Sequence, residues 1–221
     1  MASIGRSLFL IAGFAFLAGC AEQSASVAPE NAQAPAANPA NSPGAPQEET
    51  APAEFKIDFD TSRGPFVVEV TRSQAPHGAD RLYSLVKAKY FDGARFFRVV
   101  PDFMVQWGIA ADPAVTSAWD RQILDDKVIT RNARGTVTFA SPGQPNSRTT
   151  QLFINYSDNY RLDSMGFRPV GQVVSGMENV DRIYPDYGEY PDQRQISAQG
   201  NAYLIKNYPN LDYIKTARIE P

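Results

Sequence analysis

After residue 53, apolar and polar residues alternate over many short stretches, and Gly, Pro, Asn or Asp separate one stretch from the next. Alternation with a period of two is typical of β-strands that are buried on one face, because successive side chains point to opposite faces. Turn-forming residues between such stretches mark the strand ends. We therefore predict strands at residues 55–59, 66–70, 96–100, 104–107, 136–140, 151–155, 170–174 and 213–219.

Two further stretches show helical spacing. The residues from Pro76 to Lys89 place apolar side chains on one face, and Pro76 suits the first turn of a helix. A shorter helix is expected from Met177 to Tyr184. Many short strands with two interposed helices predict a closed β-barrel with helical end caps. Residues 185–200, rich in Tyr, Pro, Asp and Gln, are expected to form a surface excursion.

The first 19 residues have a different character. Arg6 is their only charge, and residues 8–17 are almost purely apolar. That run is too short to cross a bilayer core of about 30 Å as a helix, whereas a short apolar run after a positive start is typical of a secretory signal peptide. Leu17-Ala18-Gly19-Cys20 resembles the bacterial lipoprotein processing site, which implies a signal peptide at 1–19 and a lipid on Cys20. An ordinary signal peptide with a buried thiol at Cys20 is the alternative.

Residues 20–53 consist of Cys20 and a stretch built largely of Ala, Pro, Asn, Ser, Gln and Glu. They contain no aromatic residue. Such a segment buries too little apolar surface to offset its ordering entropy, which predicts a disordered linker. We expect an exported protein whose domain, residues 54–221, is tethered by the lipid to a bacterial membrane, at the outer membrane facing the periplasm. Acids and bases of that domain balance at 20 each, which argues against nucleic acid as a partner.

Two residue types common in catalytic sites are scarce, because the chain has one histidine, His77, and one cysteine, Cys20. Metal sites built from several His or Cys ligands therefore cannot form, and a catalytic triad would depend on His77 alone. No glycine-rich phosphate-binding loop follows a predicted strand. These observations predict a domain without a metal or another cofactor, and with His77 solvated at the start of the first helix.

Two segments carry candidate chemistry. In the first, residues 96–106, Arg98 lies within an apolar strand and shares a face with Phe96 and Val100. The second consists of residues 138–141, a turn, and residues 149–154. From the pattern alone, Arg98 is equally consistent with an edge-strand residue that points to water, and the second segment with two core strands joined by a polar loop.

Together these segments resemble the cyclophilin family of peptidyl-prolyl cis/trans isomerases. The run from Phe97 to Gln106 is similar to the active-site strand and loop of the family, and the run from Gln151 to Ile154 is similar to its second pocket strand. Three short motifs follow with the spacing seen in the family, namely Leu162-Asp163, Gly171-Gln172-Val173 and Gly176-Met177. The resemblance covers about residues 56–183 and the final strand.

The resemblance implies a closed eight-stranded antiparallel β-barrel capped by two α-helices, with a proline-binding groove on its outer surface. Arg98 would be the catalytic arginine, and Gln106 would assist it with a hydrogen bond near the substrate backbone. The expected partners are proline-containing unfolded or extended polypeptides, and a monomer is expected. The remaining implied substrate-binding residues are Phe103, Met104, Phe153 and Leu162 for the proline pocket, Gln151 for a hydrogen bond, Ala140 and Ser141 for the residue before proline, and Phe167.

Three positions depart from the best-known members of the family. Ser141 stands where asparagine is usual, Phe167 where a histidine often lies, and Tyr160 or Arg161 lies near the place of a pocket-rim tryptophan. A backbone contact at Ser141 would tolerate the first change. Loss of the large aromatic contact is expected to weaken cyclosporin binding more than catalysis.

The residues suit the reaction. Rotation about a peptide bond faces a barrier of about 18–20 kcal/mol from amide resonance, and it needs no nucleophile. A donor aimed at the prolyl nitrogen favours the twisted amide, and arginine is a permanent, rigid donor. The main alternative is a non-catalytic proline-peptide-binding chaperone or scaffold module, and a third is a carbohydrate-binding or structural lipoprotein barrel.

Overall fold

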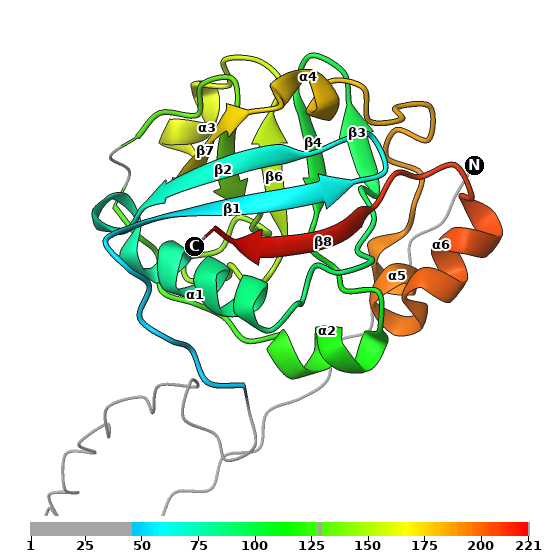
Figure 1. The fold of residues 1–221 in the computed structure, drawn as a ribbon, viewed down its shortest axis with the longest axis horizontal. Helices are drawn as coiled ribbons and strands as arrows, with labels where there is room; N and C mark the ends of the chain where they lie inside the picture. The colour runs from blue at the N-terminus through cyan, green and yellow to red at the C-terminus, as the bar shows by residue number, and fades with distance from the viewer. Residues whose placement is uncertain (1–45, 128–129, 221) are drawn as a thin grey trace, which may run out of the picture. The chain divides into compact units, whose positions relative to one another are not determined.

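The computed structural model describes residues 46–127 and 130–220. Eight strands form one antiparallel sheet in the order β3-β4-β6-β5-β7-β2-β1-β8 (Figure 1). All eight predicted strands are present, and seven of them have shifted ends. Their bounds are β1 Glu54–Thr61, β2 Phe66–Thr71, β3 Arg98–Val100, β4 Met104–Trp107, β5 Thr136–Phe139, β6 Leu152–Asn155, β7 Pro169–Ser175 and β8 Ile214–Ile219.

The sheet is curled but open, so the prediction of a closed barrel is wrong. β3 and β8 end the strand order, and they do not pair with each other. The chain before β3 does approach the first residue of β8, since Gly93 N–H donates to the carbonyl of Ile214 at 2.8 Å and Ile214 N–H donates to that of Ala94 at 2.9 Å. Farther along β3, Val99 N–H donates instead to the carbonyl of Gly188 at 3.0 Å. The chain after β7 thus occupies the edge of β3 that closure would need.

The core lies inside the curl, and the alternation of the strands explains it. On β1, Phe55, Ile57 and Phe59 are buried whereas the residues between them are exposed. The ring of Phe59 stacks on that of Phe66 with centroids 4.8 Å apart, and it meets Trp107 edge-on. One set of side chains on each strand is therefore sealed in the core, which leaves the other set free to line the outer surface.

The first predicted helix is confirmed as α1, Pro76–Lys87, and it covers one end of the curled sheet with a buried apolar face (Figure 1). The second predicted helix is much shorter, because α4 spans Met177–Val180 and the chain then turns toward Pro185. A residue before proline is disfavoured in helical conformation, which opposes extension to Tyr184.

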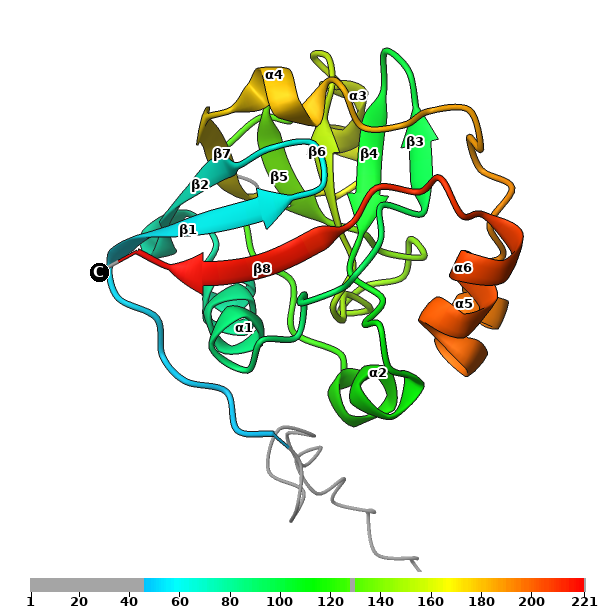
Figure 2. The same cartoon turned by 45° about the vertical axis from the view of Figure 1, so that its right-hand side comes forward.

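Four helices were not predicted. α5, Gln193–Gln199, and α6, Asn201–Asn207, lie side by side within and after the predicted excursion (Figure 2). The other two are α2, Pro113–Trp119, and α3, Arg161–Ser164, and a 3₁₀ turn, η2, spans Arg72–Gln74. The side chain of Asp112 caps α2 by accepting from one backbone N–H group of its first turn, and that of Asp192 caps α5 by accepting from two. An aspartate followed by Pro113 is a start signal that the sequence carries.

The end of the predicted linker is packed on the domain. Residues 46–53 run along α1, where Glu49 N–H donates to Ser84 Oγ at 2.8 Å and Ala51 N–H donates to Asp80 Oδ1 at 2.8 Å. Glu48 forms an ion pair with Arg81, whose side chain is buried. The folded unit thus begins before the predicted boundary at residue 54. The predicted signal peptide and Cys20 lie outside the described residues, and within those residues no helix is long and apolar enough to cross a bilayer.

Candidate active site

A cavity of about 720 Å³ lies on the outer face of β3, β4 and β6. It brings together residues from strands, two loops and α3 that are far apart in the sequence. Its lining contains all ten site residues predicted above, namely Arg98, Phe103, Met104, Gln106, Ala140, Ser141, Gln151, Phe153, Leu162 and Phe167. It also contains residues that were not predicted, namely Asp120, Gln122, Pro142, Ser147, Thr149 and Gln193.

Strand register places the central side chains in one row. Arg98 on β3 pairs with Gln106 on β4, and Gln106 pairs with Phe153 on β6. Directly opposed residues of antiparallel strands point to the same face, so these three side chains lie next to one another. The neighbours Val105 and Ile154 point the other way and join the core. Alternation therefore explains how one strand supplies both the core and the cavity.

The apolar part of the cavity is a small cluster, separate from the main core. Met104, Phe153 and Leu162 are almost fully buried in it, and the ring of Phe167 meets that of Phe153 edge-on with centroids 5.9 Å apart. Phe103 lies at its border, with the guanidinium of Arg161 5.0 Å from its ring centroid. This arrangement offers a compact apolar site with aromatic walls beside polar groups.

The polar part is a chain of hydrogen bonds that crosses the row. Arg98 Nη1 donates to Gln106 Oε1 at 3.1 Å, and Gln106 Nε2 donates to Gln151 Oε1 at 2.8 Å. The same Nη1 lies 3.8 Å from the sulfur of Met104. Although β3 is an end strand, Arg98 is 30% exposed and contacts the cavity. This position favours a residue of the site over an edge-strand arginine that points to water.

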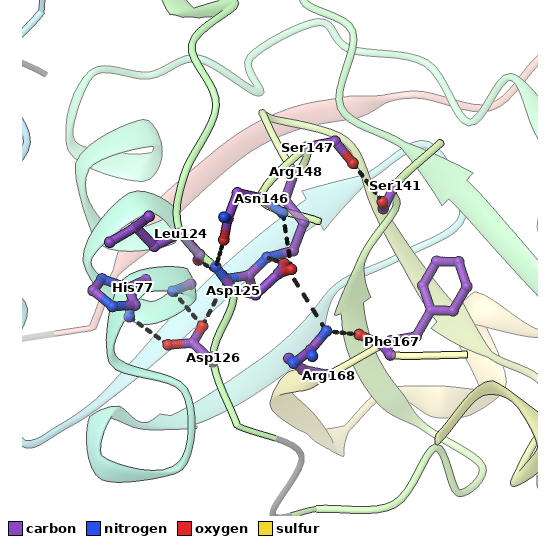
Figure 3. A network of polar contacts seen from close by, with 12 residues as sticks. His77, Leu124, Asp125, Asp126, Ser141, Asn146, Ser147, Arg148, Phe167 and Arg168 are labelled. Carbon is purple, nitrogen blue, oxygen red and sulfur yellow. Dashed lines mark hydrogen bonds and ion pairs between the residues drawn. The ribbon is translucent and has the colours of Figure 1, made fainter. Parts of the chain in front are cut away.

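A polar network holds the loop at 141–147, which forms one wall of the cavity (Figure 3). Ser141 and Ser147 share a hydrogen bond of 2.8 Å between their hydroxyls. Asp125 and Asn146 exchange two bonds, each between a backbone N–H and the side chain of the other residue. Behind them, the buried Arg148 pairs with Asp126 at 3.0 Å. The loop that borders the cavity is thus anchored to a buried ion pair.

Asp126 extends this network to α1. Its carboxylate accepts from the backbone N–H groups of His77 and Gly78, at 2.8 and 2.9 Å, where α1 begins. Unpaired N–H groups at a helix start favour a carboxylate in this position. The His77 side chain is exposed, as the sequence predicts.

The lining residues Phe103 and Leu162 are held in place through Asn159 and Asp163. Asp163 accepts from the backbone N–H and the side chain of Asn132, at 2.9 and 2.8 Å. Burial alone would raise the pKa of Asp163, but these bonds and the nearby Arg131 outweigh it and hold that pKa below its usual range. Asn159 Nδ2 donates to the carbonyl of Phe103 at 2.8 Å, which fixes the cavity loop after β3.

The chemistry available in the cavity is hydrogen bonding beside an apolar pocket. Among the described residues, no group of three or more His, Cys, Asp or Glu side chains is placed to hold a metal ion. Arg98 is a cationic donor that contacts the apolar cluster at Met104, and two glutamine amides continue its hydrogen bonds.

A family model described as cyclophilin type peptidyl-prolyl cis-trans isomerase/CLD matches residues 56–197. The chain belongs to the cyclophilin family. Among the relatives of this cyclophilin, the peptidyl-prolyl cis-trans isomerase of Acinetobacter baylyi is 33% identical over 136 residues, which cover 59% of this chain and 72% of the relative. Peptidyl-prolyl cis-trans isomerase A of Dickeya dadantii is 33% identical over 135 residues, which cover 56% and 67%. Peptidyl-prolyl cis/trans isomerisation is therefore the function of this cyclophilin.

Solved structures agree on the fold. A cyclophilin type isomerase of Cryptosporidium parvum superposes with a TM-score of 0.58 at 21% identity, and the match covers 76% of this chain and 98% of that one. The same protein, crystallised in the presence of the dipeptide Ala-Pro, superposes with a TM-score of 0.57. The cyclophilin fold thus accounts for the all-antiparallel sheet of this chain.

Proposed function

We propose that Arg98 is the catalytic residue and that it donates a hydrogen bond to the prolyl nitrogen of the substrate. Twisting an X–Pro bond breaks amide resonance and returns a lone pair to that nitrogen. A donor that reaches the lone pair stabilises the twisted amide more than either planar isomer, which lowers the barrier. The observation that carries this proposal is the position of Arg98, whose Nη1 lies between Gln106 and the apolar cluster.

The apolar cluster suits the proline ring. Met104, Phe153 and Leu162 would bind the ring, with Phe103 and Phe167 at its borders, while the acyl side of the bond turns. Gln106 and Gln151 would meet the substrate backbone with the amide groups that their mutual bond leaves free, and Ala140 and Ser141 would contact the residue before proline. The substrates are thus extended or unfolded polypeptides that contain proline. The crystallised Cryptosporidium relative, with Ala-Pro present, supports a ligand of this kind.

The runner-up is a module that uses the same groove to bind proline peptides without catalysis. A cationic donor beside the pocket favours the enzyme, since binding an apolar ring gains little from an arginine. Exchange spectroscopy by NMR on an Ala-Pro peptide separates the two, because it reports affinity and isomerisation rate together. The enzyme requires faster exchange with the full-length chain, and binding without acceleration would favour the module.

The setting of the domain is part of the proposal. A signal peptide at 1–19, a lipid on Cys20 and a linker from residue 21 to about 45 would tether a monomeric domain to the outer membrane, facing the periplasm. Leu17-Ala18-Gly19-Cys20 supports this, as does the composition of the following residues. Exported polypeptides that fold in that compartment would be the clients.

A further inference from the structure

One carboxylate in the chain between α4 and α5 contacts the arginine that we propose as catalytic. Glu189 lies in this segment, 91 positions from Arg98 in the sequence, and its Oε1 accepts a hydrogen bond from Arg98 Nε at 2.6 Å. The same Oε1 forms an ion pair with Arg98 Nη2 at 2.5 Å. Both nitrogens belong to one edge of the guanidinium. The third nitrogen, Nη1, is the one that bonds Gln106.

The segment that carries Glu189 is anchored on both sides. Before it, the carbonyl of Gly188 accepts from Val99 N–H at 3.0 Å, which fixes the segment to the edge of β3. After it, the carbonyl of Tyr190 accepts from Tyr208 Oη at 3.1 Å. The ring of Tyr187 packs edge-on against that of Tyr208 with centroids 5.2 Å apart. Holding Glu189 against Arg98 therefore requires little additional ordering of the chain.

We propose that Glu189 is a positioning residue for catalysis, which holds the Nε–Nη2 edge of Arg98 so that Nη1 faces the proline pocket. The inference rests on the proposed role of Arg98. Glu189 does not line the cavity, whereas Arg98 does. It therefore acts through the guanidinium and not by touching the substrate. An arginine side chain has several rotatable bonds, and an edge held by a carboxylate reduces the orientations open to it.

The exposure of the Glu189–Arg98 ion pair explains why losing it should affect the catalysed rate more than the stability of the fold. An exposed ion pair contributes little to stability, and the Glu189 side chain is 60% exposed. A donor that must meet a lone pair in the twisted state, however, is sensitive to small displacements. Removing Glu189 should thus change the rate of the catalysed step more than the fold or the affinity for a planar peptide.

The test compares full-length wild type with Glu189→Ala, Glu189→Gln and the control Asp186→Ala. Asp186 is an exposed acid on the same segment, and no hydrogen bond or ion pair of its side chain is found among the described residues. NMR exchange spectroscopy on an Ala-Pro peptide gives the isomerisation rate at saturating enzyme and, separately, the peptide affinity. The ¹⁵N-resolved Nε–H signal of Arg98, assigned with Arg98→Lys, reports the contact itself.

We expect Glu189→Ala to lower the saturated rate about tenfold while the affinity stays within about twofold. Glu189→Gln should recover part of the rate, because its amide oxygen still accepts from Nε. Asp186→Ala should match wild type. The Nε–H signal should exchange with water faster in Glu189→Ala than in either Asp186→Ala or wild type.

Two results would overturn the proposal. One is a Glu189→Ala rate equal to that of Asp186→Ala, and the other is a rate above wild type, which would make Glu189 a competitor of the substrate. Failure of the proposed function looks different, since wild type itself would then leave peptide exchange unaccelerated. Independently of the rate, an Arg98 Nε–H signal that Glu189→Ala leaves unchanged would show that Glu189 and Arg98 are not in contact in solution.

Discussion

Arg98 and Gln106 are direct cross-strand partners on β3 and β4, and Arg98 Nη1 donates to Gln106 Oε1 at 3.1 Å. This bond orients the Gln106 amide, because its oxygen faces Arg98 and its Nε2 donates to Gln151 at 2.8 Å. The register of two short strands thus arranges the donors of the groove. We therefore expect replacement of Arg98 to lower the isomerisation rate much more than the peptide affinity.

Replacing Arg98 with Ala should lower the isomerisation rate at saturating enzyme by about 10²–10³-fold, the usual effect of losing one preorganised donor. Peptide affinity should fall much less, since the apolar cluster is intact. Arg98→Lys should recover little, because an ammonium lacks the planar fork. NMR exchange on an Ala-Pro peptide measures both quantities. Near-full exchange rates in Arg98→Ala would refute the mechanism.

Replacing Phe153 with Ala should weaken both binding and turnover. The ring of Phe153 is part of the apolar cluster and supports Phe167 edge-on at 5.9 Å. Losing that surface should lower the affinity for a proline peptide about tenfold or more. A peptide titration followed by NMR measures the affinity, and circular dichroism checks that the variant is folded. Unchanged affinity in a folded variant would place the proline ring elsewhere.

Replacing Arg81 with Met should destabilise the fold by about 3 kcal/mol, because it removes the buried partner of a partly buried ion pair and leaves backbone carbonyls without their donor. Arg81 pairs with Glu48 and also donates from Nη1 to the carbonyls of Arg121 and Thr149, at 2.8 and 3.0 Å. Denaturant unfolding of the full-length chain measures the change.

The matched control for Arg81 is Lys87→Met on the same helix. Lys87 pairs with Glu49 of the same N-terminal segment, but both side chains are about half exposed. Its loss should therefore cost no more than about 1 kcal/mol. Equal effects of the two substitutions would mean that residues 46–53 do not pack on α1 in solution.

Asp80 should make stability depend on pH in the acid range. Burial would raise its pKa, but bonds from Arg72 and from Ala51 N–H outweigh burial and hold the pKa below its usual range. The stabilisation is thus fully present above the unfolded value of about 3.9, and it is lost as pH falls through the lower folded value. Unfolding free energies measured from pH 6 to pH 2 should decrease less steeply in Asp80→Asn than in wild type. Equal slopes would contradict this role of Asp80.

Replacing Cys20 with Ser should abolish lipidation and leave the chain uncleaved or misprocessed. The thiol is the acyl acceptor in the processing site that Leu17-Ala18-Gly19-Cys20 resembles. Mass spectrometry of mature protein from a bacterial membrane fraction checks both variant and wild type. An unmodified Cys20 in mature wild-type protein would rule out the anchor.

Several features of the site could be predicted from local sequence because they depend on local chemistry. Alternation located every strand, including the short β3 and β4, and Pro76 marked the start of α1. Residues with strong motif context, such as Arg98 and Phe153, were found by their order along the chain, and the structure places them on one cavity. The contact of Glu189 with Arg98 and the place of Gln193 in the cavity lining had no comparable signal, since an exposed acid or amide in a polar segment resembles many others.

The sequence by itself determined the strands, the first helix, the family and ten of the residues that line the cavity, because side-chain periodicity and motif order are properties of the chain. Tertiary structure alone decided that the sheet stays open, that residues 46–53 pack on α1 and that Glu189 meets Arg98. Each of these depends on contacts between distant segments, such as Val99 with Gly188 and Glu48 with Arg81. Their free energies come from geometry and burial that exist only after the chain has folded, and no local pattern records them.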